Sequence, residues 1–250
     1  MGHGVIRLLG AALLRSFSIQ GSWSLDRLQG IGFAVSIEPL LRLLPGGRNG
    51  IRYRAALGRA TGYFNAHPFL AGLAVGAVAR ADRDDLPQPQ VDRLRAALKG
   101  PLGALGDRLV WAGVLPLASA AGILGVAAGR PLIGVGGFLV IFNVPHLLLR
   151  GWGLPVGWAL GRAVARAIQQ PLLQRGTVVA GIAAVAAIGF IIPVAATWLL
   201  RDFPGSGRVA AGAIGVATFA LARGLAPALG PARVGLLAIG ATLLLGWIWR

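Results

Sequence analysis

Residues 98–111 read L-K-G-P-L-G-A-L-G-D-R-L-V-W, a stretch in which a Gly-Pro pair, two further glycines and one carboxylate precede a long apolar run. Glycine and proline interrupt the helical hydrogen-bond ladder, so this stretch predicts a bend. At membrane depth a bend is tolerated only where protein or a watery cavity satisfies the backbone. We therefore expect Asp107, at the bend, to face a polar cavity and not lipid.

The composition indicates a membrane protein. Of the 250 residues, 56% are hydrophobic and only 13% are charged, too few for the exterior of a soluble domain. The 39 glycines would let membrane helices approach one another closely. The chain has no cysteine, which excludes disulfides and thiolate metal sites. We expect neither a metal nor a cofactor.

The net charge of +16 comes mostly from arginines in short clusters between apolar segments. This placement is typical of cytoplasmic membrane loops and not of a nucleic-acid-binding surface. Residues 150–175 contain four arginines and no acid, so we expect a cytoplasmic linker there. The bilayer, and no nucleic acid, is the expected partner of the basic residues.

The N-terminal third predicts short helices. Ser22 or Ser24 is expected to cap a helix that runs to residue 44, with Asp26 in its first turn. Glu38 lies in the apolar part of that helix. Two interpretations stay open for it: an ion pair with Arg42 one turn later, or a functional carboxylate.

The next segments alternate between surface helices and breaks. Residues 51–63 form an arginine-rich amphipathic pattern suited to a membrane surface. Pro68 then breaks the chain and leaves Asn65 and His67 as polar groups at the break. Residues 69–79 are too short to span a bilayer and suit a re-entrant or half-helix. A short amphipathic helix is expected over residues 91–99.

Longer apolar runs follow. Residues 112–129 and 131–149 form either a spanning hairpin or shorter re-entrant pieces. Residues 177–200, 209–231 and 234–249 predict three closing transmembrane helices. The expected fold is an all-α integral membrane protein: amphipathic and re-entrant or broken helices, then about three transmembrane helices. We expect one domain over residues 11–250, whose signature-bearing part is 11–160, with a cytoplasmic N-terminus and an external C-terminus.

Four ordered blocks within residues 11–160 resemble one family, the IID component of the mannose/fructose/sorbose-type sugar phosphotransferase system (PTS). Residues 20–29 resemble its Q-G-S-W-N-[YF]-E-R-M-Q element, and residues 63–69 its F-F-N-T-[HQ]-P-[YF] element. Residues 99–111 resemble M-G-P-L-A-G-[IV]-G-D-x-[LI]-F-W, and residues 142–147 resemble F-N-[IL]-x-[HR]-L.

The resemblance implies a permease subunit in the bacterial inner membrane that pairs with a IIC component and translocates a hexose. IIC–IID pairs are expected to form an oligomer, and phosphohistidines on IIA and IIB would supply the phosphoryl group. No catalytic or phospho-accepting residue is expected in this chain. Sugar binding needs planar polar groups and an aromatic face. The candidate sugar-binding residues are Asn65, His67, Asp107, Gln20, Trp23 and Glu38.

Departures from the family pattern support a second hypothesis, a scaffold or regulatory IID-like subunit that does not transport. Lys99 replaces an apolar residue, Arg108 a small one, and Leu115 an arginine. We expect Lys99 or Arg108 to clamp an ionised Asp107, because an unpaired carboxylate is costly at membrane depth. Asp107 could instead cap a helix that begins near Leu109.

Overall fold

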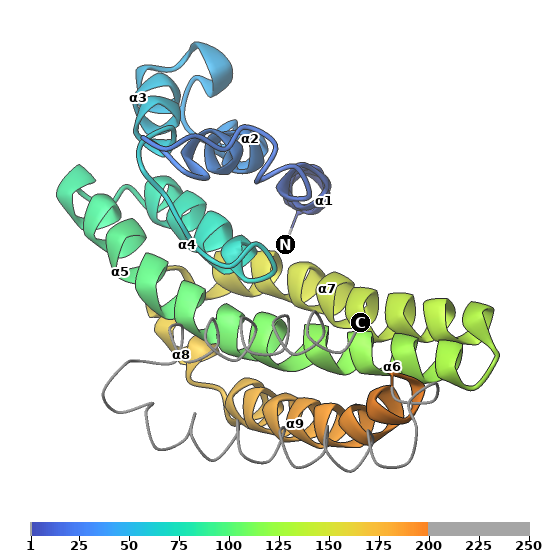
Figure 1. The fold of residues 1–250 in the computed structure, drawn as a ribbon. Coiled ribbons are helices and arrows are strands. Elements are labelled where there is room, and N and C mark those ends of the chain that lie inside the picture. The colour runs from blue at the N-terminus through green and yellow to red at the C-terminus, as the bar shows by residue number, and fades with distance from the viewer. Residues whose placement is uncertain (1, 200–250) are drawn as a thin grey trace. The chain divides into compact units, whose positions relative to one another are not determined.

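The computed structural model describes residues 2–199, which form helices and two isolated bridges but no strand. Two compact units divide the chain, Met1–Ile192 and Pro193–Arg250, and all contacts described below lie in the first. Figure 1 labels the main helices. In chain order the elements are α1 His3–Ser16, α2 Gly30–Leu41, η1 Gly47–Asn49, α3 Ile51–Ala60, α4 Ala71–Arg83, α5 Gln88–Gly106, the π-helix η2 Asp107–Val114, α6 Leu115–Ala127, α7 Pro131–Leu160, η3 Gly161–Ala163, α8 Ala165–Ile168 and α9 Pro171–Leu199.

Helices α1 to α4 form an N-terminal body in which α4 lies on the side facing α7. The expected short helix after Pro68 is present as α4, and nearly all of its residues are buried. It packs against α2 and α7, and the rings of Phe33 and Phe64 lie 4.3 Å apart in the same core. Because protein surrounds it, α4 can be apolar without reaching the length of a membrane span.

Helices α4 and α7 meet backbone to backbone through two pairs of glycines, Gly72 with Gly76 and Gly153 with Gly157. A Cβ atom added to Gly76 would lie 3.0 Å from the carbonyl carbon of Gly157 and 2.5 Å from the nitrogen of Trp158. Small residues spaced four apart allow such an approach in membrane proteins. The glycine-rich composition is thus used at this crossing.

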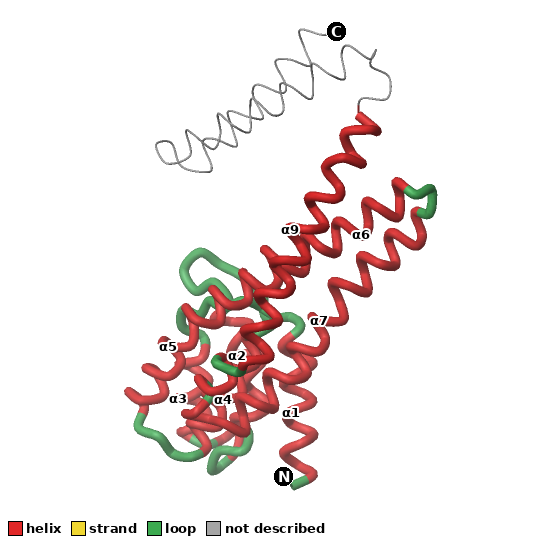
Figure 2. Tube along the Cα trace, turned by 90° about the horizontal axis from the view of Figure 1, so that it is seen from below, coloured by secondary structure: helices red, strands yellow, loops and turns green. Residues whose placement is uncertain are grey.

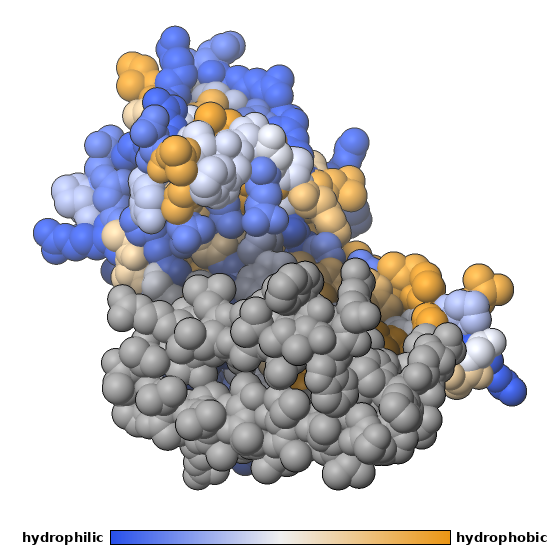
Figure 3. All heavy atoms as spheres, in the orientation of Figure 1, coloured by the Kyte–Doolittle hydropathy of each residue, from blue (hydrophilic) through white to orange (hydrophobic). Residues whose placement is uncertain are grey.

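Three helical segments are long and apolar enough to cross a membrane: Gln88–Ala127, Pro131–Ala163 and Ala165–Gly189. Figure 2 shows α6, α7 and α9 projecting together away from the N-terminal body. Helices α6 and α7 form an antiparallel hairpin, so the hairpin alternative is the one observed. Polar side chains gather on the N-terminal body in Figure 3, whereas apolar side chains are frequent on the visible part of the hairpin, next to a few polar ones.

The bend predicted at residues 98–111 is wrong. The chain stays helical through Pro101, and the helix widens into the π-helix η2 at Asp107. Leu98, Leu102 and Leu105 are all buried on one face, so their packing holds the helix together despite the proline. The short helix expected at 91–99 is therefore part of the longer α5.

The predicted start of the second helix is also wrong. Residues 20–29 form turns, and α2 begins only at Gly30, so neither Ser22 nor Ser24 caps it and Asp26 lies outside its first turn. Tertiary contacts explain the difference, because Leu28, which pairs locally with Ser24, also forms a bridge with Phe64.

The C-terminal predictions are met in part. Arg150 was expected in a linker, but α7 continues to Leu160 and places Arg150 inside that helix. The linker predicted at residues 150–175 is therefore shorter and begins after Leu160. The span predicted at 177–200 is helical through Leu199 as part of α9. The spans predicted at 209–231 and 234–249, like the C-terminus, lie outside the described residues.

Candidate functional site

The break before α4 is built around His67. The carbonyl of His67 accepts hydrogen bonds from the backbone N–H groups of Leu70 and Ala71, both at 3.0 Å, and so starts the helix. Its Nδ1 accepts a hydrogen bond of 3.3 Å from the backbone N–H of Phe69. The ring proton is consequently on Nε2, which is buried without a hydrogen-bond partner among the described residues.

Burial lowers the pKa of His67 to about 4, and the nearby positive charge of Arg150 acts in the same direction. The imidazole is therefore neutral at physiological pH. A neutral, buried imidazole with a free N–H is a hydrogen-bond donor and not a charge. It is also poorly placed for a soluble phosphodonor, since its residue is only 2% exposed.

His67 joins two of the signature blocks in space. Its ring lies 5.2 Å from the indole of Trp111 and 5.0 Å from the ring of Phe69. The imidazole also packs on the backbone of Gly106, where an added side chain would overlap it. Asp107 follows Gly106 directly, so the residues 63–69 block and the start of η2 form one site.

The polar candidates around this site are exposed. Asn65 and Asp107 both face solvent, and Trp111 is 48% exposed. The clamp expected on Asp107 is absent from the described structure: Lys99 Nζ lies 4.7 Å from the ring centre of Tyr63, and Arg108 Nε donates to the carbonyl of Ala104 at 3.4 Å.

Gln20 and Trp23 lie on an exposed loop beside the same segment. Sequence reasoning gave no role to Gln29, which fixes that loop. The side-chain amide of Gln29 donates to the carbonyl of Ala66 at 2.8 Å and accepts from its N–H at 3.2 Å. Phe64 N–H also donates to the carbonyl of Arg27. The residues 20–29 block is thus anchored next to Asn65.

Glu38 belongs to a separate cluster. Arg42 donates to its two oxygens at 2.9 and 2.6 Å, Arg15 at 2.6 Å, Arg48 at 3.2 Å and the Tyr53 hydroxyl at 2.8 Å. Burial raises the pKa of Glu38, but the hydrogen bonds from Arg42 and Tyr53 and the charges of Arg42 and Arg15 outweigh burial and hold the pKa at about 2. The predicted pair with Arg42 is confirmed, and the cluster ties α1, α2, η1 and α3 together.

Two further residues of α7 extend the site, and sequence reasoning gave neither a role. His146 stacks on Phe69 with ring centres 4.0 Å apart. Arg150 donates from Nε to His146 Nε2 at 2.6 Å and from Nη1 to the carbonyl of Ser16 at the end of α1. The residues 142–147 block was the available signal for His146. Arg150 is buried and its guanidinium lies 4.9 Å from the ring of Phe17.

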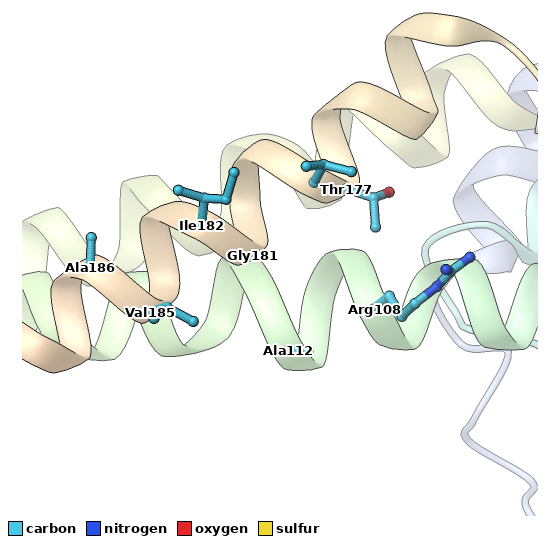
Figure 4. Close-up of a pocket in the computed structure, with 8 residues that line it drawn as sticks. Arg108, Ala112, Thr177, Gly181, Ile182, Val185 and Ala186 are labelled. Carbon is cyan, nitrogen blue, oxygen red and sulfur yellow. The ribbon is translucent and has the colours of Figure 1, made fainter.

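A cavity of about 650 Å³ lies between η2 and α9. Figure 4 shows Arg108 and Thr177 at one end and apolar side chains along the rest. Its lining residues are Arg108, Ala112, Thr177, Val178, Gly181, Ile182, Val185 and Ala186. In residues 2–199, no cluster of three His, Asp or Glu side chains could hold a metal ion.

The chain is similar to known proteins over most of its length. Residues 7–201 match the model of a protein family described as "PTS system mannose/fructose/sorbose family IID component". The mannose-specific EIID component of Escherichia coli (strain K12) is 30% identical over 184 residues, which cover 72% of this chain and 64% of that relative. The match thus spans less than two thirds of that relative. The sorbose-specific EIID component of Klebsiella pneumoniae is 30% identical over 95% of this chain and 85% of its own.

Solved structures share the fold. A membrane protein superimposes with a TM-score of 0.70 at 25% identity, covering 94% of this chain and 95% of the other. The cryo-EM structure of the mannose transporter ManYZ with microcin E492 (MceA) matches with a TM-score of 0.58 at 25% identity, over 94% of each chain. This all-α membrane protein belongs to the IID family of mannose/fructose/sorbose-type PTS components.

Proposed function

We propose that the chain is the IID membrane subunit of a mannose-type PTS permease and that, with a IIC partner, it binds and translocates a hexose. Family membership and the mannose and sorbose names of the relatives support this proposal. In it, IIA and IIB carry the phosphoryl group to the sugar. This chain contributes binding and no phospho-accepting side chain.

The contact between His67 and Trp111 is the observation that supports a sugar site at this place. Asn65 lies two residues before His67 and Asp107 four residues before Trp111 in the chain; both are exposed, and the indole is half-exposed. Amide and carboxylate groups bind pairs of sugar hydroxyls, and an indole face packs on the ring carbons. Gln20 and Trp23, on the loop that Gln29 anchors, are proposed to complete the site from the other side.

Replacement of Asp107 tests this proposal. Asp107→Asn keeps the shape and removes the charge, so we expect loss of sugar uptake while the complex with IIC still assembles. Asp92→Asn is the matched control, because Asp92 is also an exposed acid of the same helical segment. Full uptake by the Asp107→Asn variant would restrict Asp107 to a structural role.

Ligand binding distinguishes transport from the scaffold hypothesis. A ligand that binds only the folded state raises the melting temperature, and the increase grows with the logarithm of the ligand concentration above Kd. We expect a hexose to stabilise the purified IIC–IID pair, and the stabilisation to disappear with Asp107→Asn. A pair that no hexose stabilises would support the scaffold hypothesis, which the departures at Lys99, Arg108 and Leu115 motivate.

We further propose that the protein lies in the bacterial inner membrane as an oligomer of IIC–IID pairs, with the N-terminal body in the cytoplasm. The arginines at 162 and 166 follow α7 at the same end as the body, which agrees with a cytoplasmic location. A periplasm-active reporter should work when inserted in the α6–α7 turn at residues 128–130 and fail in residues 161–170. The reverse pattern would overturn this orientation.

The IIC partner is proposed to be needed for folding in the membrane. Exposed Asn65 and Asp107 lie where apolar helices leave the body, and polar groups there need polar neighbours. Co-expression with IIC should yield a monodisperse complex, whereas this chain alone should aggregate in detergent. A stable, monodisperse chain without IIC would contradict an obligate pair.

A further inference from the structure

The groove between η2 and α9 is polar at one end and apolar along the rest of its length. Helices η2 and α9 touch where Gly113 faces Ala180, since a Cβ atom at Gly113 would lie 2.8 Å from that of Ala180. Beside this contact the cavity of about 650 Å³ begins at Arg108 and Thr177. It continues along Ile182 and Val185, which are 65% and 71% exposed.

Among the described residues, the guanidinium of Arg108 has no acidic partner and could bind an anion. Its only described hydrogen bond is the long one of 3.4 Å to the carbonyl of Ala104, and no carboxylate in residues 2–199 forms an ion pair with it. Arginine binds phosphate strongly because its planar fork of N–H groups matches two phosphate oxygens. The hydroxyl of Thr177 would not donate to the same anion, because it already donates a hydrogen bond of 3.0 Å to the carbonyl of Leu173.

The apolar course of the groove matches an acyl chain in length. From Thr177 to Ala186 the helix rises about 14 Å, nine residues at 1.5 Å each. One leaflet of a bilayer has about 15 Å of hydrocarbon, half of the usual core. The groove also runs away from the N-terminal body, along helices that are apolar enough to cross the membrane.

We propose that this groove binds an anionic phospholipid, with its phosphate on Arg108 and one acyl chain along Ala112, Gly181 and Val185. The lining offers a sugar too few hydrogen-bonding groups, because every lining residue apart from Arg108 and Thr177 is apolar. The negative charge of anionic lipid headgroups attracts arginines that lie at the membrane surface. The site is separate from the proposed sugar site, and it stands even if the transport proposal fails.

Photocrosslinking in native membranes tests the proposal on the full chain. Two probes carry a photoactivatable diazirine in the middle of an acyl chain, one a phosphatidylglycerol and one a phosphatidylcholine. The anionic probe should label peptides of η2 and α9 about five-fold more than the neutral one, the factor expected for one arginine. Labelling elsewhere, equal labelling by both probes, or crosslinking of the groove to a protein subunit in place of lipid would overturn it.

Two substitutions at Arg108 test the headgroup contact. Arg108→Gln should remove the five-fold preference for the anionic probe, and Arg108→Lys should retain most of it. Arg93→Gln is the matched control, because Arg93 is an exposed arginine of the same helical segment outside the groove. A preference that survives Arg108→Gln would overturn the assignment.

A third substitution tests the acyl-chain course without touching charge. Gly181 has open space where a side chain would begin, so Gly181→Leu should fold and fill the groove. We expect several-fold less labelling of η2 and α9 by both probes. Gly176→Leu, on the same helix but lining a different cavity, should label like the unmodified protein. Equal labelling of the Gly181→Leu variant would overturn the proposed course.

Discussion

The imidazole of His67 lies directly on the backbone of Gly106, with no room for a side chain between them. This contact joins the residues 63–69 block to the start of η2, two segments separated by some 40 residues in the chain. Gly106 is therefore required by packing against His67, and not by an unusual backbone angle, since its backbone is helical.

Gly106→Ala should destabilise the protein because the new methyl group meets the Cβ of His67, which has no free rotation to avoid it. Overpacking of this kind costs about 1–3 kcal/mol. Thermal unfolding of the purified IIC–IID complex measures the effect. Gly103→Ala, in the same helix with open space around it, should leave the melting temperature unchanged or slightly raised.

His67 should make stability depend on pH between 6.5 and 4. The folded-state pKa of about 4 lies below the ordinary 6.5, so the folded protein resists protonation that the unfolded chain accepts. Stability is full above pH 6.5 and falls as the pH drops, by about 2 kcal/mol at pH 5. Unfolding at pH 7 and pH 5 should show this loss, and His67→Gln should show less of it. An equal loss in the variant would contradict the buried neutral state.

The Glu38 cluster should lose its contribution to the free energy of unfolding at a lower pH than His67 does. Its pKa of about 2 lies below the ordinary 4.5, so Glu38 contributes stability that is present above pH 4.5 and is lost as the pH falls toward 2. Glu38→Gln should cost about 1–3 kcal/mol at pH 7, because it leaves buried donors poorly paired. Tyr53→Phe removes one hydrogen bond and should cost about 1 kcal/mol. Chemical denaturation at pH 7 compares both variants with the unmodified protein.

The glycines between α4 and α7 should not tolerate alanine. Gly76→Ala and Gly157→Ala each place a methyl group against backbone of the other helix, which cannot move aside without separating the helices. We expect lower yields of folded protein and a melting temperature reduced by several degrees. Gly136→Ala, in α7 where nothing lies within 4 Å, is the control. Normal stability of the Gly157→Ala variant would contradict the close crossing.

Patterns within one helix were the predictable part of this molecule. Hydropathy indicated most of α9 and allowed the α6–α7 hairpin as one of two alternatives, and the spacing of Glu38 and Arg42 allowed their ion pair as one of two interpretations. Such features depend on residues three or four apart, which the sequence shows directly.

Contacts between distant segments were not predictable in the same way. Pro101 and its neighbouring glycines indicated a bend, yet burial of Leu98, Leu102 and Leu105 keeps α5 helical up to the π-helix. Ser24 was read as a helix cap because its pairing with Leu28 depends on a loop fixed from elsewhere. The clamp predicted on Asp107 relied on cations close in sequence, whereas Lys99 lies over the ring of Tyr63 and Arg108 donates to the carbonyl of Ala104.

The backbone contact between α4 and α7 has a mechanical consequence. Where the backbones of two helices are in direct contact, the tight packing opposes sliding of one helix along the other. A tilt or translation of α7 during a transport cycle would carry α4 with it as one stiff piece. His67, whose carbonyl starts α4, would move by the same displacement. The glycines would thus couple any motion of this membrane helix to the polar residues at the start of α4.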